Sequence, residues 1–213
     1  MKETISLSLT YDHDVLVNKG NNPKRCFVLL HGYLLDGDYI YNKLLPILNE
    51  DDLIIAPNGP FLIPVEKKET HIPKYSWYFF DASSETYYIN FEPAAEYVNH
   101  ILNYYNTENL PVTIIGYSQG GYLSPKIAEF NSNIKTIIGL ACVFRNKKFK
   151  INTNTTYHQI HGNLDVIVEK KNALAEWEDL KNRGNEGDFR SLENSGHRID
   201  NEFLAELKRL ILL

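Results

Sequence analysis

The sequence is poor in cysteine. Only Cys26 and Cys142 occur among its 213 residues, and each lies beside a run of apolar residues. Two cysteines in a chain of this length do not form the disulfide framework that is typical of small secreted domains. We therefore expect both to be buried free thiols in a reducing compartment, and we expect a cytoplasmic protein.

Long apolar runs are also lacking. No stretch approaches the roughly eighteen consecutive apolar residues that a membrane-spanning helix needs. Residues 1–9 alternate between polar and apolar types, whereas a secretory signal peptide has a continuous apolar core. We therefore expect no integral membrane segment.

Positive charge is sparse and not concentrated. The 22 Lys and Arg residues are outnumbered by 27 Asp and Glu residues, which gives a net charge of -5. The strongest basic run, residues 145–150, is short, so we expect a solvated loop there and no nucleic-acid partner. The hydrophobic content of 43% and charged content of 23% are typical of a globular protein, and the length predicts a single domain over residues 1–213.

What the sequence does contain is an alternation of strand and helix patterns. Strands are predicted at residues 4–10, 12–20, 25–30, 53–56, 112–115, 135–142, 156–160 and 189–192. Helices are predicted over residues 39–49, 93–105, 119–131 and 168–183, and from residue 201 onward. The order predicts an α/β fold with a mainly parallel, twisted sheet and helices on both faces. Functional loops of such folds lie at the carboxyl ends of the strands.

A serine stands at one of these strand ends. Gly116–Gly121 reads GYSQGG and follows the apolar strand at 112–115. In the pattern G-x-S-x-G the serine occupies a strained turn between strand and helix, where neighbouring side chains would clash. Ser118 is therefore a candidate nucleophile.

A serine hydroxyl needs a histidine to take its proton and an acid to orient that histidine. Asp165 and His197 follow Ser118 in the order that this kind of fold uses, and each lies just past a predicted strand. Asp165 could instead cap the next helix, His197 could cap the last one, and Asp188 or Glu193 could compete for the orienting role. We rank Asp165 ahead of both because its loop has the expected position.

The transition state of acyl transfer also needs two N–H donors for the oxyanion. One is expected from Gln119, and the other from the loop that begins at His31 and Gly32. We interpret His31 and His161 as structural residues that hold loops. His158 and His161 are expected on opposite faces of a strand, so we expect no metal site.

Several motifs together resemble the phospholipase/carboxylesterase family of α/β-hydrolases, which includes bacterial carboxylesterases and acyl-protein thioesterases. They are LHG at 30–32, APNGP at 56–60, WY at 77–78, GYSQGG at 116–121, HGNLDVIV at 161–168 and GH at 196–197. The resemblance covers nearly the whole chain and implies the α/β-hydrolase fold. It also implies Ser118 as nucleophile, Asp165 as orienting acid and His197 as general base, with oxyanion amides from Tyr33 and Gln119.

Two departures from the family pattern affect the expected site. After Tyr33 the family usually has glycine and then aspartate, but this chain has Leu34, Leu35 and Asp36, so the donor is either Tyr33 or Leu34. The family tryptophan is closely followed by aspartate, but here residues 79–80 are both phenylalanine. We expect Leu34 and Trp77 to contact the substrate.

Residues 57–92 show neither the hydrophobic period of a helix nor that of a strand, and they are rich in aromatic residues. We therefore predict an irregular insertion that packs over the rest of the domain. Its aromatic side chains either cover an apolar acyl groove or form ordinary core.

The resemblance implies hydrolysis of a carboxylic ester or thioester without a cofactor. The alternatives are a small-ester carboxylesterase, an acyl-protein thioesterase or lysophospholipase, and a non-catalytic ligand-binding homologue. The sequence leaves the oligomeric state open, and a homodimer is compatible with it.

Overall fold

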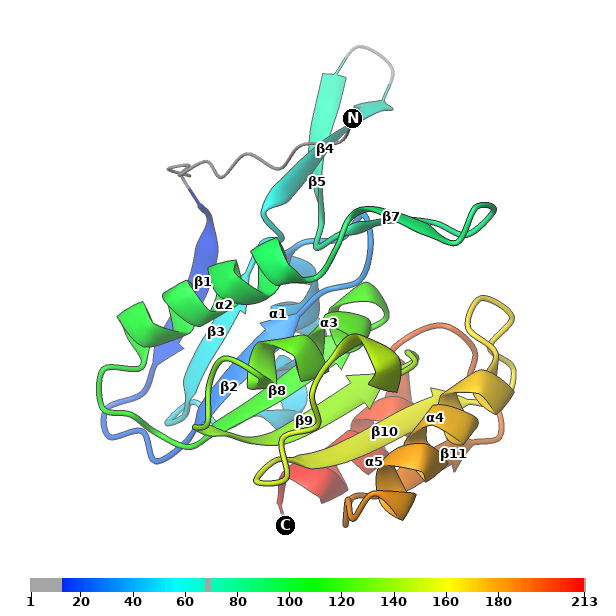
Figure 1. Cartoon of the computed structure of the whole chain (residues 1–213). Coiled ribbons are helices and arrows are strands. Elements are labelled where there is room, and N and C mark those ends of the chain that lie inside the picture. The colour runs from blue at the N-terminus through cyan, green and yellow to red at the C-terminus, as the bar shows by residue number, and fades with distance from the viewer. Residues whose placement is uncertain (1–12, 68–69, 213) are drawn as a thin grey trace, which may run out of the picture.

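A computed structural model describes residues 13–67 and 70–212, and a seven-stranded sheet forms its centre (Figure 1). The strand order is β1-β3-β2-β8-β9-β10-β11, and only β1 runs antiparallel to its neighbour. The strands are β1 (Val15–Lys19), β2 (Cys26–Leu30), β3 (Leu53–Pro57), β8 (Val112–Tyr117), β9 (Ile134–Leu140), β10 (Thr156–Gly162) and β11 (Phe189–Leu192). The predicted mainly parallel sheet is confirmed, while the strand predicted at 4–10 lies outside the described residues.

The sheet is buried on both faces because its central strands are apolar throughout. In β2 every residue is buried. Cys26, Val28 and Leu30 belong to one core cluster, whereas Phe27 and Leu29 belong to the cluster on the opposite face. This division follows from the two-residue period of a strand.

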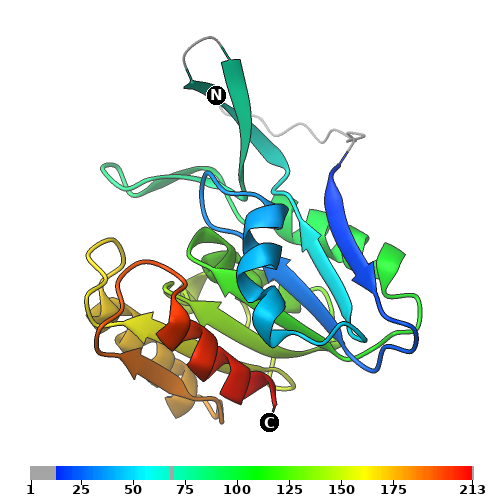
Figure 2. The ribbon, with the colours of Figure 1, turned by 180° about the vertical axis from the view of Figure 1, so that it is seen from behind.

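Helices cover both faces, as predicted (Figures 1 and 2). They are α1 (Gly37–Leu44), α2 (Glu92–Tyr105), α3 (Gln119–Ala128), α4 (Lys170–Asn182) and α5 (Asn201–Ile211). Buried residues of α1 and α5 belong to one core cluster, and those of α2 and α3 to the other, which also takes Leu180 of α4. Among the residues that the structure describes, no helix is long and apolar enough to cross a membrane.

Two of the predicted helices end several residues earlier than expected. The helix predicted over 39–49 ends at Leu44 and continues as a 3-10 turn, η1 (Leu45–Ile47), because Pro46 cannot donate a backbone hydrogen bond. The helix predicted to reach residue 131 ends at Ala128. Pro125 lies inside it, and the Ser124 hydroxyl donates to the Gly120 carbonyl at 2.7 Å.

The prediction of an irregular insertion at 57–92 is wrong, because this stretch forms two antiparallel hairpins. One joins β4 (Phe61–Lys67) to β5 (Thr70–Ser76), and the other joins β6 (Phe79–Asp81) to β7 (Thr86–Ile89). Pro64 and Pro73 pair with each other in the first hairpin, which projects from the sheet (Figure 1). Proline argues against a central strand but is tolerated in a two-stranded ribbon, where both strands are edges. The prolines therefore concealed the strand pattern.

Much of the aromatic content of this region is core. The ring centroids of Tyr78 and Phe91 are 4.6 Å apart, and those of Tyr78 and Tyr87 are 6.0 Å apart. Trp77 has no exposed surface, whereas Tyr88 is 72% exposed. The packing agrees with the core alternative for Trp77, Tyr78 and Phe91.

The two cysteines are free and buried, as predicted. Burial raises the pKa of the Cys26 thiol to about 12, and it also raises the pKa of Cys142. Both thiols are therefore protonated at neutral pH, which makes them poor nucleophiles.

Candidate active site

Ser118 occupies the tight turn between β8 and α3. Its backbone has φ 49° and ψ -116°, a left-handed conformation that is strained for a residue with a side chain. A Cβ atom at Gly120 would lie 2.5 Å from the Leu30 carbonyl oxygen. Glycine at position 120 therefore lets the start of α3 approach the end of β2, so the turn presents Ser118 at the carboxyl edge of the sheet.

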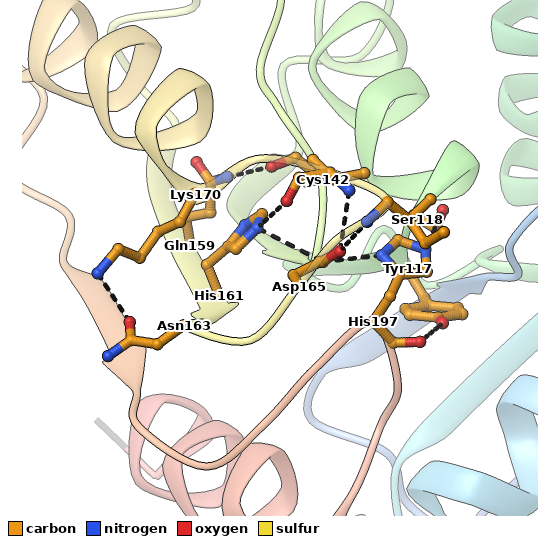
Figure 3. Close-up of polar contacts among 11 residues, drawn as sticks. Tyr117, Ser118, Cys142, Gln159, His161, Asn163, Asp165, Lys170 and His197 are labelled. Atoms are coloured by element: carbon orange, nitrogen blue, oxygen red, sulfur yellow. Dashed lines mark hydrogen bonds and ion pairs between the residues drawn. The ribbon is translucent and has the colours of Figure 1, made fainter.

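The structure brings Ser118, His197 and Asp165 together in one hydrogen-bond chain (Figure 3). The His197 Nε2 atom lies 3.0 Å from the Ser118 hydroxyl, and His197 Nδ1 lies 2.8 Å from Asp165 Oδ2. The three residues follow β8, β11 and β10, whose carboxyl ends meet at the same edge of the sheet. The arrangement fits a histidine that donates from Nδ1 to the carboxylate and accepts from the serine at Nε2.

Asp165 is held in place by its own loop. Its other oxygen, Oδ1, accepts the backbone N–H groups of Ile167 at 2.9 Å and Val168 at 2.8 Å. The residue is only 8% exposed. These bonds fix the carboxylate plane, so Oδ2 remains directed at His197.

His197 is fixed by its neighbour in the elbow. The Tyr117 hydroxyl donates to the His197 carbonyl at 3.0 Å, and the two ring centroids are 5.5 Å apart. This contact ties the loop after β11 to the turn that carries Ser118.

The competing assignments for these residues have no support in the geometry. Asp188 pairs with Arg190 at 3.0 Å, and Glu193 is exposed, so neither is placed to orient His197. The N-cap of α4 is Glu169, and that of α5 is Asp200. Asp165 and His197 therefore do not cap the helices that follow them.

The loop after β2 is hydrogen-bonded to the first hairpin. Leu34 adopts φ 59°, so this position takes the left-handed conformation without a glycine. Its N–H donates to the Tyr75 carbonyl at 3.1 Å, and Leu35 forms an isolated bridge with Tyr75. The Leu34 N–H is therefore already used in a hydrogen bond to Tyr75. The N–H groups of Tyr33 and Gln119 have no acceptor within the described part of the chain.

The side chain of Gln119 has a role that the sequence did not indicate. Its Oε1 accepts the Trp77 backbone N–H at 2.9 Å, and its Nε2 donates to the Tyr78 carbonyl at 2.8 Å. These bonds attach the segment between the two hairpins to the start of α3. A glutamine after the serine is the only sequence signal for this contact.

Trp77 differs from the expectation that it lines a substrate groove. Its indole N–H donates to the His31 carbonyl at 2.8 Å, and its ring lies 4.8 Å from the His31 ring. The side chain has no exposed surface, so in this structure it packs against the loop after β2 from the core side and does not face solvent.

His31 holds the same loop, in agreement with its structural interpretation. Its Nδ1 lies 2.7 Å from the Gly32 carbonyl and donates to it, while Nε2 accepts the Gly59 N–H at 2.9 Å. Only the neutral ring can do both. Burial is the main cause that lowers the pKa of His31 from 6.5 to about 4.

This lowered pKa predicts a loss of stability in mild acid. The unfolded chain takes up a proton near pH 6.5, whereas folded His31 does so only near pH 4. The free energy of unfolding should therefore fall as the pH decreases through this window, by up to about 1.4 kcal/mol per pH unit. Urea unfolding between pH 7 and pH 5 measures the slope. It should be smaller in His31→Gln than in the exposed control His100→Gln, and equal slopes in the two variants would contradict the account.

His161 supports the loop that carries Asp165. It is fully buried, and its Nε2 donates to the Val168 carbonyl at 2.8 Å and lies 3.5 Å from Asp165 Oδ2. Burial lowers its pKa, so the ring is neutral. Across the described ranges, no group of three or more His, Cys, Asp or Glu side chains is arranged to hold a metal ion.

The mainly parallel sheet, with helices on both faces and Ser118 on a strand-to-helix elbow, defines the α/β-hydrolase fold. A search of curated proteins gave no match. The family model described as Phospholipase/Carboxylesterase matches residues 11–212, and the chain belongs to this family.

Solved structures share the fold at low sequence identity. Acyl-protein thioesterase 2 of Zea mays is 19% identical with a TM-score of 0.76, over 93% of this chain and 97% of that chain. Esterase PE8 is 19% identical with a TM-score of 0.69, over 94% and 97%. A Bacillus cereus carboxylesterase is 15% identical with a TM-score of 0.69, over 93% and 92%.

Proposed function

We propose that the protein is a serine hydrolase that cleaves carboxylic esters or thioesters through an acyl-enzyme on Ser118. The observation that carries this proposal is the hydrogen-bond chain from Ser118 through His197 to Asp165. Membership of the Phospholipase/Carboxylesterase family supports it.

The chemistry proceeds in two halves. His197 takes the proton of Ser118 as its oxygen attacks the carbonyl carbon, and then gives that proton to the leaving alcohol or thiol. Water next attacks the acyl-enzyme with the same histidine as base, which releases the acid and restores the serine. Asp165 keeps the proton on His197 Nδ1 and stabilises the imidazolium.

We assign the oxyanion donors to the N–H groups of Tyr33 and Gln119. Gln119 follows the nucleophile, and Tyr33 belongs to the loop after β2, as this fold requires. Leu34 is the weaker candidate because its N–H already bonds to Tyr75 at 3.1 Å. Two preorganised donors would stabilise the negative charge that develops on the carbonyl oxygen.

A specific observation favours long acyl chains, as in the thioesterase or lysophospholipase alternative. Leu164, Val166 and Ile167 surround Asp165 in sequence and are 60%, 88% and 71% exposed. Three exposed aliphatic side chains beside a candidate catalytic residue offer an apolar surface for a substrate chain.

A series of p-nitrophenyl esters from acetate to decanoate, together with a palmitoyl thioester, tests the proposed reaction and its chain-length preference. We expect hydrolysis, with kcat/KM rising by up to about fourfold per added CH₂. This factor corresponds to the free energy gained by burying one methylene group. The rise should be smaller in Val166→Ser than in wild type. A kcat/KM that falls as the acyl chain lengthens would identify a short-ester carboxylesterase, and a folded protein that cleaves none of the substrates would refute the hydrolase.

A further inference from the structure

Three tyrosines and two basic residues gather beside the candidate nucleophile. The tyrosines are Tyr78 between the two hairpins, Tyr87 in β7 and Tyr122 in α3. The Arg145 guanidinium carbon lies over the Tyr122 ring at 5.7 Å from its centroid, and the Lys148 Nζ lies over the Tyr87 ring at 5.0 Å. Elements far apart in the sequence thus meet here.

This cluster adjoins the Ser118 site. Tyr122 is one helical turn beyond the nucleophile, and its N–H donates to the Ser118 carbonyl at 3.1 Å. The Tyr122 side chain packs against a small core cluster that contains Val143 and Val168. Val168 bonds to Asp165 Oδ1, so Tyr122 lies between the basic loop after β9 and the loop of the candidate triad.

The polar groups of the cluster lack partners. In the part of the chain that the structure describes, the hydroxyls of Tyr78, Tyr87 and Tyr122 have no hydrogen-bond partner, although Tyr78 is only 8% exposed. No described carboxylate lies within ion-pair distance of Arg145 or Lys148. None of the three hydroxyl oxygens is among the fully buried side-chain atoms that lack a partner, so each is accessible and can donate a hydrogen bond to a bound ligand.

The charges define the kind of ligand. Burial raises the pKa of all three tyrosines, so each hydroxyl is a protonated donor. The Arg145 guanidinium lies over the Tyr122 ring, and its positive charge opposes the rise of the pKa of each tyrosine. A cation surrounded by hydroxyl donors suits a carboxylate or phosphate group.

We propose that Arg145, with the hydroxyls of Tyr78, Tyr87 and Tyr122, forms a subsite for an anionic group of the substrate. The inference rests on the proposed hydrolase function and narrows its substrate class. The preferred substrates are esters or thioesters whose acyl or alcohol part carries a carboxylate or a phosphate.

Matched substrates test the subsite. The mono-p-nitrophenyl ester of glutaric acid carries a free carboxylate, and its methyl ester is the neutral counterpart of nearly the same length. We expect Arg145→Gln to lower the ratio of kcat/KM for the anionic ester over the neutral ester about tenfold, the effect of losing one charge-assisted hydrogen bond. Tyr122→Phe should lower it less. Lys147→Gln, an exposed change in the same loop, should leave the ratio within twofold.

A binding measurement separates this inference from the proposed function. Titration of Ser118→Ala with glutarate and with inorganic phosphate should show saturable binding of at least one anion, and the tighter one identifies the group recognised. Addition of Arg145→Gln should weaken that binding about tenfold. Binding without hydrolysis by wild type would refute the hydrolase and retain the subsite. An unchanged substrate ratio in Arg145→Gln, or no binding of either anion, would overturn the subsite.

Discussion

Replacement of Ser118 by alanine should lower ester hydrolysis by on the order of a millionfold, the largest effect expected for any single change in this chain. The reason is that the acyl-enzyme needs an oxygen at this position, and no other hydroxyl is within hydrogen-bond distance of His197 Nε2 among the described residues. The measurement is kcat for a p-nitrophenyl ester at saturating substrate.

The control for this change is Ser132→Ala, because Ser132 is exposed and far in sequence from the elbow. It should hydrolyse the ester at the wild-type rate. The free energy of unfolding of Ser118→Ala should not fall, because the change removes a hydroxyl at a strained turn without creating a core cavity. Retention of more than about one per cent of wild-type activity in purified Ser118→Ala would show that Ser118 is not the nucleophile.

Asp165→Asn should lower turnover by about 10⁴-fold, a magnitude taken from the corresponding change in serine proteases. An amide at this position can donate to His197 Nδ1, which favours the tautomer with its proton on Nε2. That tautomer cannot accept the proton of Ser118. The substitution keeps the side-chain volume, and the amide oxygen can still accept the N–H groups of Ile167 and Val168 that now bond to Asp165 Oδ1.

Two matched changes test the assignment of the acid. Asp188→Asn and Glu193→Gln remove the two carboxylates that the sequence offers as alternatives to Asp165 for orienting His197. Both changes should leave turnover within about twofold of wild type. Comparison of kcat for the three variants decides which carboxylate orients His197. A large loss in Asp188→Asn or Glu193→Gln, with little loss in Asp165→Asn, would move the orienting role to that residue.

The sheet was predictable from the sequence because its strands carry a simple signal. Residues 26–30 and 53–57 are apolar throughout, as buried parallel strands require, and each is followed by a breaker. The candidate triad was predictable for a related reason. Parallel strands place their carboxyl ends at one edge, so residues just past β8, β10 and β11 converge however far apart they are in the sequence.

The hairpins were not predictable by the same means. Proline at positions 64 and 73 contradicts a strand when each segment is considered alone, and only the pairing of the two prolines across a ribbon resolves the conflict. A local pattern contains no information about that pairing.

Hydrogen bonds between segments far apart in the chain were also not predictable from the sequence. Nothing in residues 31–35 indicates that the Leu34 N–H would bond to Tyr75, and nothing near Trp77 indicates that its indole would bond to the His31 carbonyl. Both contacts depend on how the first hairpin folds back on the loop after β2. Trp77 therefore supports this loop from the core, where the sequence suggested a substrate-facing side chain.

The central claim is that Ser118 is an activated nucleophile, and an activity-based fluorophosphonate probe measures this most directly. Such a probe forms a covalent adduct only with a serine that a neighbouring base makes reactive. Mass spectrometry of the digested wild-type protein should find one adduct, on Ser118, and labelling should be much slower in Asp165→Asn. A folded wild-type protein that carries no adduct at Ser118 would contradict the account.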